Sequence, residues 1–121
     1  MSARILIIDD SPTVREKISS LLAEEGYEVF AEGNAAKAIE SIKEIRPDLV
    51  ILDIMMPEMD GYTLLRHIRK EKAFAALPVL MLSAKEEEGM KDLFSLEGIS
   101  GYMQKPFQDE DLIDLIDKTL E

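Results

Sequence analysis

The chain has 121 residues, no cysteine and a formal net charge of -11 at pH 7. This length predicts a single domain that is large enough to bury a core of its own. The lack of cysteine excludes disulfides and thiolate metal sites, which suits a reducing compartment such as the cytoplasm. No apolar stretch approaches the ~20 residues that span a bilayer, so we expect no membrane segment. The acidic charge also argues against nucleic acid or an anionic membrane surface as a direct partner.

The first expected strand and helix lie at the N-terminus. An apolar run predicts a buried strand over residues 4–8, because buried parallel strands carry apolar side chains on both faces. Ser11 can cap the helix that follows, and Pro12 suits its first turn. Gly26 suits the position just past the end of this helix.

The middle of the chain repeats this pattern. A second strand is expected over residues 27–31, and Asn34 can cap a second helix. Pro47 ends that helix, because the residue before a proline avoids the helical region. A third buried strand is expected over residues 49–52, and the proline and Asp-Gly signals within residues 55–61 predict a loop.

The C-terminal half continues the alternation. Apolar residues at helical spacing around 64–68 predict a third helix, and Pro78 opens a fourth strand. A fourth helix is expected over 85–96 and a short fifth strand over 101–104, before a fifth helix that Asp109 can cap. Five strand–helix repeats predict an α/β fold, in which helices cover both faces of a parallel sheet.

Reactive side chains follow the expected strands at one end. Asp9 and Asp10 come directly after the first apolar run, and Asp53 comes after the third. Ser83 closes the fourth strand, and Lys105 follows the fifth. Binding sites of open parallel sheets form beyond the carboxyl ends of the strands. We therefore expect three carboxylates, one hydroxyl and one ammonium to meet in one pocket.

This set of groups suits phosphoryl chemistry assisted by a hard cation. Two like charges ~4 Å apart repel by about 4 kcal/mol at an effective dielectric of ~20, so three carboxylates need more positive charge than Lys105 supplies. Carboxylates without histidine or cysteine favour Mg²⁺, and Asp9 and Asp10 fit as its ligands. Asp53 then remains as a nucleophile that can form an aspartyl phosphate. Mg²⁺, Lys105 and Ser83 can each serve one phosphoryl oxygen.

Each of these residues also has a plainer interpretation. Asp9 and Asp10 can act only as acidic residues that favour a helix N-terminus. Asp53 can be a turn or cap residue, and Ser83 can cap the helix that follows it. The joint pattern favours the chemical interpretation, because every one of these residues falls at the same end of its own strand.

Four stretches and their spacing carry a resemblance to a known family: ILIIDDSPTVR, DLVILDIMMPEMDGYTLLRHIR, LPVLMLSAK and GYMQKPF. The chain resembles the receiver domain of two-component response regulators, and is similar to the stand-alone chemotaxis-type regulators. The resemblance implies a flavodoxin-like (βα)5 three-layer fold with strand order 2-1-3-4-5. It also implies that residues 1–121 form one receiver domain, with no output domain in this chain.

The resemblance implies roles around the metal and the phosphoryl group. Asp53 matches the phosphoacceptor of the family. Asp9 and Asp10 match the acids that bind Mg²⁺, together with the backbone carbonyl of Met55. Lys105 matches the phosphate-binding lysine. No cofactor other than Mg²⁺ is implied.

The resemblance also implies a conformational switch and a partner surface. Ser83 matches the switch hydroxyl and Tyr102 the switch aromatic, and the bond between Lys105 and Pro106 is expected to be cis. A histidine kinase or phosphotransfer protein is the expected phosphoryl donor. A downstream protein is expected on the face made by the fourth helix, the fifth strand and the fifth helix. The chain is expected to be a monomer or a phosphorylation-linked dimer.

Two positions depart from the chemotaxis pattern. Met55 and Lys85 stand two residues after Asp53 and Ser83, where fast-dephosphorylating regulators carry an amide or an acid. A thioether is only a weak acceptor and cannot orient an attacking water. We therefore expect slow autodephosphorylation, and no enzymatic turnover of another substrate.

Two alternatives on the same fold are less compatible with the sequence. A flavin-binding, flavodoxin-like protein needs a neutral or basic phosphate loop after the first strand, where Asp9 and Asp10 would repel the flavin phosphate. A phosphatase of the haloacid dehalogenase type needs a second acid two residues after the nucleophile, where Met55 stands.

Overall fold

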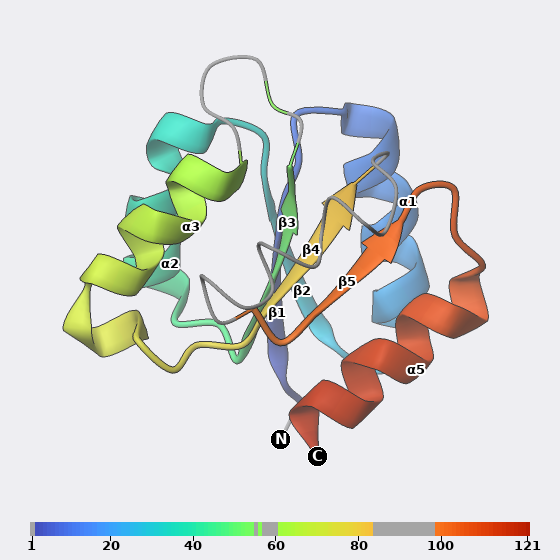
Figure 1. Cartoon of the computed structure of the whole chain (residues 1–121). Coiled ribbons are helices and arrows are strands. Elements are labelled where there is room, and N and C mark those ends of the chain that lie inside the picture. Colours follow the sequence, from blue (N-terminus) through green and yellow to red (C-terminus); the bar gives the residue numbers. More distant parts are fainter. Residues whose placement is uncertain (1, 55, 57–60, 84–98) are drawn as a thin grey trace.

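The computed structural model describes residues 2–54, 56, 61–83 and 99–121. Its strands are β1 (Arg4–Ile8), β2 (Glu28–Glu32), β3 (Leu49–Asp53), β4 (Val79–Ser83) and β5 (Gly101–Gln104). Its helices are α1 (Pro12–Glu24), α2 (Ala38–Ile45), α3 (Gly61–Lys70) and α5 (Asp109–Leu120), with 3₁₀ turns η1 (Ala35–Lys37) and η2 (Lys72–Phe74). One sheet lies between two layers of helices, α1 with α5 and α2 with α3 (Figure 1). The helix expected over 85–96 lies outside the described residues.

The sheet has the strand order that the resemblance implies. Its strands are all parallel, in the order β2-β1-β3-β4-β5. The strand that follows β1 in the chain lies on one side of it, and β3, β4 and β5 lie on the other side. Ligands of such sheets bind in the crevice between β1 and β3, where this order reverses. Ile8 pairs with Leu52 across β1 and β3, so the residues that follow, Asp9 and Asp53, emerge side by side.

The sheet is buried on both faces. Along β1, Ile5 and Ile7 pack toward α1 and α5, while Leu6 and Ile8 pack toward α2 and α3. The fully buried helix residues that meet these faces are Ile18, Leu22, Leu112 and Ile116 on one side, and Ile42, Leu64, Leu65 and Ile68 on the other. Burying each such side chain contributes about 1.5–3 kcal/mol. The two apolar layers therefore fix the sheet from which the polar strand ends project.

Helix α1 begins and ends as the sequence predicts. The Ser11 side chain accepts a hydrogen bond from the backbone amide of Val14 at 3.3 Å, and Pro12 occupies the first helical position. Past the helix end, Gly26 has a φ of 92°, which a residue without a side chain adopts at least cost. None of the described helices is long and apolar enough to cross a membrane.

The second strand and second helix begin later than expected. The backbone amide of Tyr27 bonds to the Leu22 carbonyl at the end of α1. The amide of Glu28 instead bonds to the carbonyl of Ala3, directly before β1, and Glu28 is the first residue paired with β1. Strand β2 is therefore shifted by one residue, to Glu28–Glu32. Asn34 caps the 3₁₀ turn η1 through the amide of Ala36, and α2 starts only at Ala38.

The remaining boundaries differ by single residues. Asp53 is the last residue of β3 rather than the first residue after it. Ser83 closes β4, as expected. Gly61, expected in the loop, is the first residue of α3. Asp109 does not cap α5, because Gln108 occupies the cap position without a side-chain hydrogen bond and Asp109 lies in the first turn. The three acids in that turn interact favourably with the positive end of the helix dipole.

Candidate functional site

Asp9 is an acid of the site that several hydrogen bonds hold in place. Its side chain is 1 % exposed. The backbone amide of Asp9 donates to the Glu32 carbonyl at 3.1 Å, and its Oδ1 accepts a hydrogen bond from the amide of Ser11 at 2.9 Å. Buried carboxylates need such donors, because an unpaired buried charge is costly. The backbone and the turn into α1 therefore orient the Asp9 carboxylate.

Arg15 completes the environment of Asp9 and was not singled out from the sequence. Its Nη1 donates to the backbone carbonyl of Asp9 at 2.7 Å. The guanidinium lies against Gly33, where a Cβ would come within 2.4 Å of the same nitrogen. The only sequence signal is its place in the first turns of α1, directly after the acid pair. Arg15 thus positions Asp9 through its backbone carbonyl and not through its carboxylate.

Asp53 lies at the end of β3, whose five residues are all buried, and is itself 4 % exposed. The start of α3 approaches its backbone closely. Gly61 donates its amide to the Ile54 carbonyl at 2.8 Å. A Cβ on Gly61 would lie 2.7 Å from the backbone oxygen of Asp53, so this position accepts only glycine without a shift of the backbone. Gly61 is a second site-shaping residue that the sequence analysis treated only as part of a loop.

Lys105 connects the two buried acids. Its Nζ lies 3.1 Å from Oδ2 of Asp9 and 3.3 Å from Oδ1 of Asp53. Burial alone lowers the pKa of the Lys105 ammonium, but the hydrogen bond and charge of Asp9, followed by those of Asp53, raise it overall. The bond between Lys105 and Pro106 is cis, as expected. The ammonium is therefore held in its charged form between both carboxylates.

Three carboxylates converge at this edge of the sheet, as the sequence predicts. Asp9, Asp10 and Asp53 each offer one oxygen, and these oxygens lie within 4.8 Å of one another. Asp10 is exposed, while the other two acids are buried. Oxygen donors at this spacing suit a hard divalent cation. With Lys105 as the single positive charge in contact with them among the described residues, the cluster could hold a metal ion.

The other expected site residues lie on β4 and β5 or outside the described residues. Ser83 ends β4 and pairs with Gln104, while Tyr102 lies two residues earlier on β5, opposite Met81. Tyr102 is half-buried against the core layer of α2 and α3. Met55 and Lys85 lie outside the described residues.

This arrangement of a sheet edge, acids and lysine identifies a class of signalling domain. The model of the response regulator receiver domain matches residues 5–117. The chain belongs to this family, whose members are phosphorylation-dependent signalling switches.

The most informative relatives are stand-alone regulators. The chain is 42 % identical over 121 residues to the chemotaxis protein CheY of Bacillus subtilis, covering 99 % of both chains. It is 33 % identical over 118 residues to the protein PilH of Pseudomonas aeruginosa, covering 98 % of both. The chemotaxis protein CheY4 of Vibrio cholerae superposes with a TM-score of 0.93 at 29 % identity, over 99 % of this chain and 100 % of that one. Nothing in these comparisons favours the flavin-binding or phosphatase alternative.

Proposed function

We propose that Asp53 accepts a phosphoryl group from a phosphorylated histidine kinase or phosphotransfer protein, in a reaction that needs Mg²⁺. The observation that carries this proposal is the position of Lys105, whose ammonium lies between the carboxylates of Asp9 and Asp53. A cation in this place offsets charge on the attacking carboxylate and on the phosphoryl oxygens that would arrive beside it.

Asp53 acts as the nucleophile in this proposal. One carboxylate oxygen attacks the phosphorus of a phosphohistidine, so that an oxygen–phosphorus bond forms and the phosphorus–nitrogen bond breaks. The imidazole leaves with the electron pair of that bond and takes a proton from water. Lys105 stays protonated at neutral pH because its pKa is raised, and it balances negative charge throughout the transfer.

Asp9 and Asp10, together with the backbone carbonyl of Met55, are the groups proposed to hold Mg²⁺. Their hard oxygen donors fit this ion. When bound, Mg²⁺ neutralises and orients the phosphoryl oxygens. The bonds from Ser11 and Arg15 hold Asp9 in one orientation. Asp10 is exposed, so its carboxylate would be accessible to an ion from solvent.

The switch is proposed to run through Ser83 and Tyr102 toward the C-terminal strand and helix. These residues lie on the neighbouring strands β4 and β5. Partial burial of Tyr102 suits a ring that takes an inward position in one state and an outward position in the other. A downstream protein, or a second phosphorylated copy, would then bind the surface of β5, α5 and the helix expected over 85–96.

This role is proposed for the cytoplasm, with residues 1–121 acting as one receiver domain. The chain would catalyse nothing beyond its own phosphorylation and a slow autodephosphorylation. The phosphoryl group is thus a signal that the chain carries, and the partner bound at its surface reads that signal.

Chemical phosphorylation tests the assignment. Acetyl phosphate with Mg²⁺ should add one phosphoryl group to the wild type, measured by intact mass spectrometry, and none to Asp53→Asn. Lys105→Ala should be labelled about a hundredfold more slowly, because it loses a charge aimed at the transferring group. Asp114→Asn, which makes the same chemical change at an exposed position of α5, should be labelled normally. Equal labelling of the Asp53→Asn variant would place the phosphoryl group elsewhere.

A further inference from the structure

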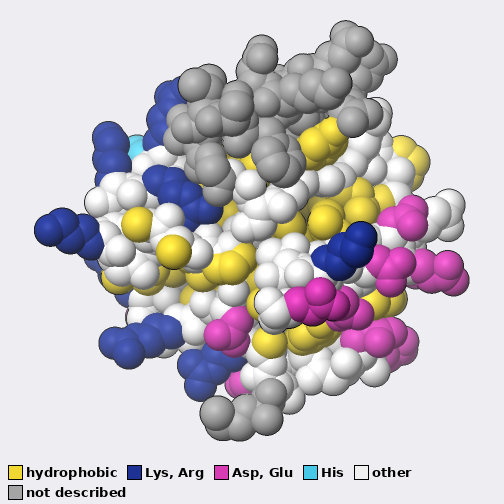
Figure 2. Space-filling model, turned by 60° about the horizontal axis from the view of Figure 1, so that its bottom comes forward, with side chains coloured by type: hydrophobic (Ala, Val, Ile, Leu, Met, Phe, Trp, Pro, Cys, Tyr) yellow, Lys and Arg dark blue, Asp and Glu magenta, His cyan; other side chains and the backbone are white. Residues whose placement is uncertain are grey.

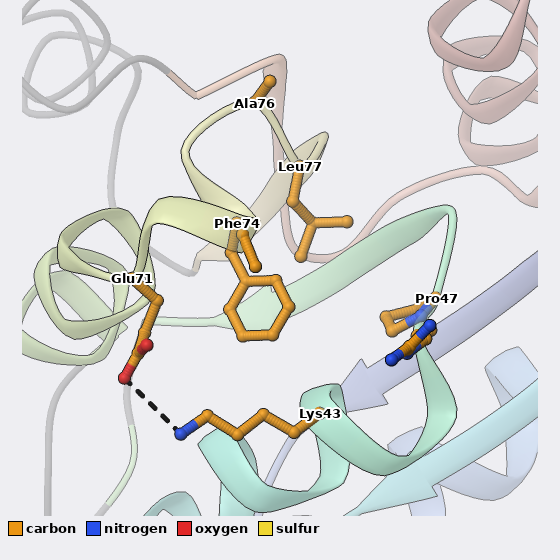
Figure 3. Close-up of a pocket in the computed structure, with 8 residues that line it drawn as sticks. Lys43, Pro47, Glu71, Phe74, Ala76 and Leu77 are labelled. Carbon is orange, nitrogen blue, oxygen red and sulfur yellow. Dashed lines mark ion pairs between the residues drawn. The ribbon is translucent and has the colours of Figure 1, made fainter.

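A groove lies at the edge of the sheet opposite the acid cluster. It is formed where α2 ends and where η2 leads into β4 (Figure 3), and has a volume of about 580 Å³. Pro47 precedes β3 and Leu77 comes just before β4, so the groove sits at the amino ends of these strands. A volume of this size accommodates a few side chains of a bound segment.

The floor of the groove is apolar and fixed in shape. The Phe74 ring lies in its centre, between Leu77 on one side and Lys43 on the other (Figure 3). Phe74 and Leu77 are half-buried and pack against the core layer of α2 and α3. Arg69 donates from Nη1 to the Phe74 carbonyl at 2.9 Å and so holds the 3₁₀ turn in place. An apolar side chain entering the groove would meet a surface that is already formed.

The rim of the groove carries cations. Lys43 forms an ion pair with Glu71 at 3.5 Å along one side (Figure 3). Arg46, which also lines the groove, adopts a left-handed conformation with φ 53° at the end of α2. It is exposed and makes no ion pair with any residue that the structure describes. One unneutralised guanidinium and one partly neutralised ammonium therefore border the apolar floor.

The charge of the surrounding surface strengthens this pattern. Residues 61–78 contain four lysines and arginines and one acidic residue, whereas α5 (Asp109–Leu120) contains five acidic residues and one lysine. Lysine and arginine side chains gather on the side of α2, α3 and η2, and acidic side chains on the side of α5 (Figure 2). In a chain of net charge -11, a negative partner is repelled elsewhere and guided to this side.

We propose that this groove docks a short acidic segment of a partner protein. One large apolar side chain of the segment would lie against Phe74 and Leu77, and flanking carboxylates would pair with Arg46 and Lys43. A bare polyanion such as nucleic acid fits less well, because the floor is apolar and Glu71 lies on the rim. A second copy of this chain fits less well also, because two chains of charge -11 repel each other.

The position of the groove predicts that docking is independent of phosphorylation. The acid cluster lies at the carboxyl ends of β1 and β3, whereas the groove lies at the amino end of β3 and β4. The proposed segment would therefore hold the protein in a complex in both signalling states, rather than read the state. This makes the inference separable from the function proposed for Asp53.

Fluorescence anisotropy tests the docking with a short labelled peptide that has a central phenylalanine flanked by glutamates. Arg46→Glu should weaken binding by about tenfold, since it replaces an attractive charge by a repulsive one. Lys118→Glu, which makes a matching charge reversal at an exposed position of α5, should alter the affinity for the peptide by less than about twofold. Asp53→Asn should bind as the wild type does. A peptide with serine in place of phenylalanine should bind at least about tenfold more weakly.

A second pair of variants tests the groove by size. Ala76→Trp should fill the groove and abolish peptide binding. Ala23→Trp, at an exposed position of α1, should leave peptide binding unchanged. Amide NMR shifts on titration of the peptide should centre on Phe74 and Leu77. The proposal is overturned by no binding to the wild type, by equal losses in Arg46→Glu and Lys118→Glu, or by shifts confined to α5. Tighter binding of a labelled oligonucleotide, lost in Arg46→Glu, would overturn the peptide assignment in favour of nucleic acid.

Discussion

The guanidinium of Arg15 donates a 2.7 Å hydrogen bond to the backbone carbonyl of Asp9. Within the described part of the chain, Asp9 forms hydrogen bonds through its amide to Glu32, its carbonyl to Arg15, and its two carboxylate oxygens to Ser11 and Lys105. Some residues hydrogen-bond to a metal ligand without binding the metal themselves. Removing such a residue typically lowers metal affinity by about 10–100-fold. Arg15 is therefore placed to control how well Asp9 serves a cation.

Arg15→Ala should weaken Mg²⁺ binding by about tenfold, measured by isothermal titration calorimetry, and Arg15→Lys should recover part of the loss. Lys118→Ala removes a cation from an exposed position of α5 and should leave Mg²⁺ affinity unchanged. Equal affinity in the wild type and in Arg15→Ala would show that the turn bond from Ser11 suffices to orient Asp9.

Mg²⁺ should stabilise the fold through the cluster of Asp9, Asp10 and Asp53. An ion that binds only the native state at about ten times its dissociation constant adds about 1.4 kcal/mol, which is several degrees in melting temperature for a domain of this size. Thermal melts with and without Mg²⁺ measure this shift. Asp10→Asn should abolish most of it, while Asp114→Asn should keep it. A full shift in Asp10→Asn would place the ion elsewhere.

The hydrogen bond between Tyr27 and Asp117 should give stability that is lost in alkali. The Tyr27 hydroxyl donates to the Asp117 carboxylate, and burial, with that bond and the nearby charge, raises the pKa of Tyr27 to about 12. A tyrosine in the unfolded chain titrates near pH ~10. A raised pKa in the folded state means that the contribution is fully present below pH ~10 and disappears as the pH rises through about 12.

Urea unfolding of the wild type and Tyr27→Phe measures this contribution. The difference in unfolding free energy between them should be constant at neutral pH and should shrink as the pH rises above ~10. A difference that does not change with pH would assign the effect of the hydroxyl to packing rather than to its proton.

The aspartyl phosphate should persist longer than in fast chemotaxis regulators. Hydrolysis needs a water held in line with the phosphorus–oxygen bond, and Met55 offers only a weak acceptor for it. A protonated Lys85 cannot act as a base. Met55→Asn and Lys85→Glu should each accelerate decay, followed as loss of the phosphoryl mass over time. Unchanged decay in both variants would mean that other groups position the water.

The element order, the parallel sheet and the set of acids with Lys105 could be predicted from local patterns in the chain. These features depend on local patterns: continuous apolar runs, helix caps such as Ser11, and polar residues directly after each run. The joint placement of Asp9, Asp53 and Lys105 follows once the strands are parallel, because parallel strands end at the same edge.

Other features depend on contacts between residues distant in the chain, and these could not be predicted before the fold was known. The register of β2 depends on whether Tyr27 bonds to Leu22 in α1 or joins the ladder, and either choice satisfies its amide. Arg15 acquires its role from a carbonyl and from Gly33, which come together only when β2 lies beside β1. The groove at Phe74 exists because α2 and η2, distant in sequence, pack at one edge of the sheet, and no local pattern encodes that meeting.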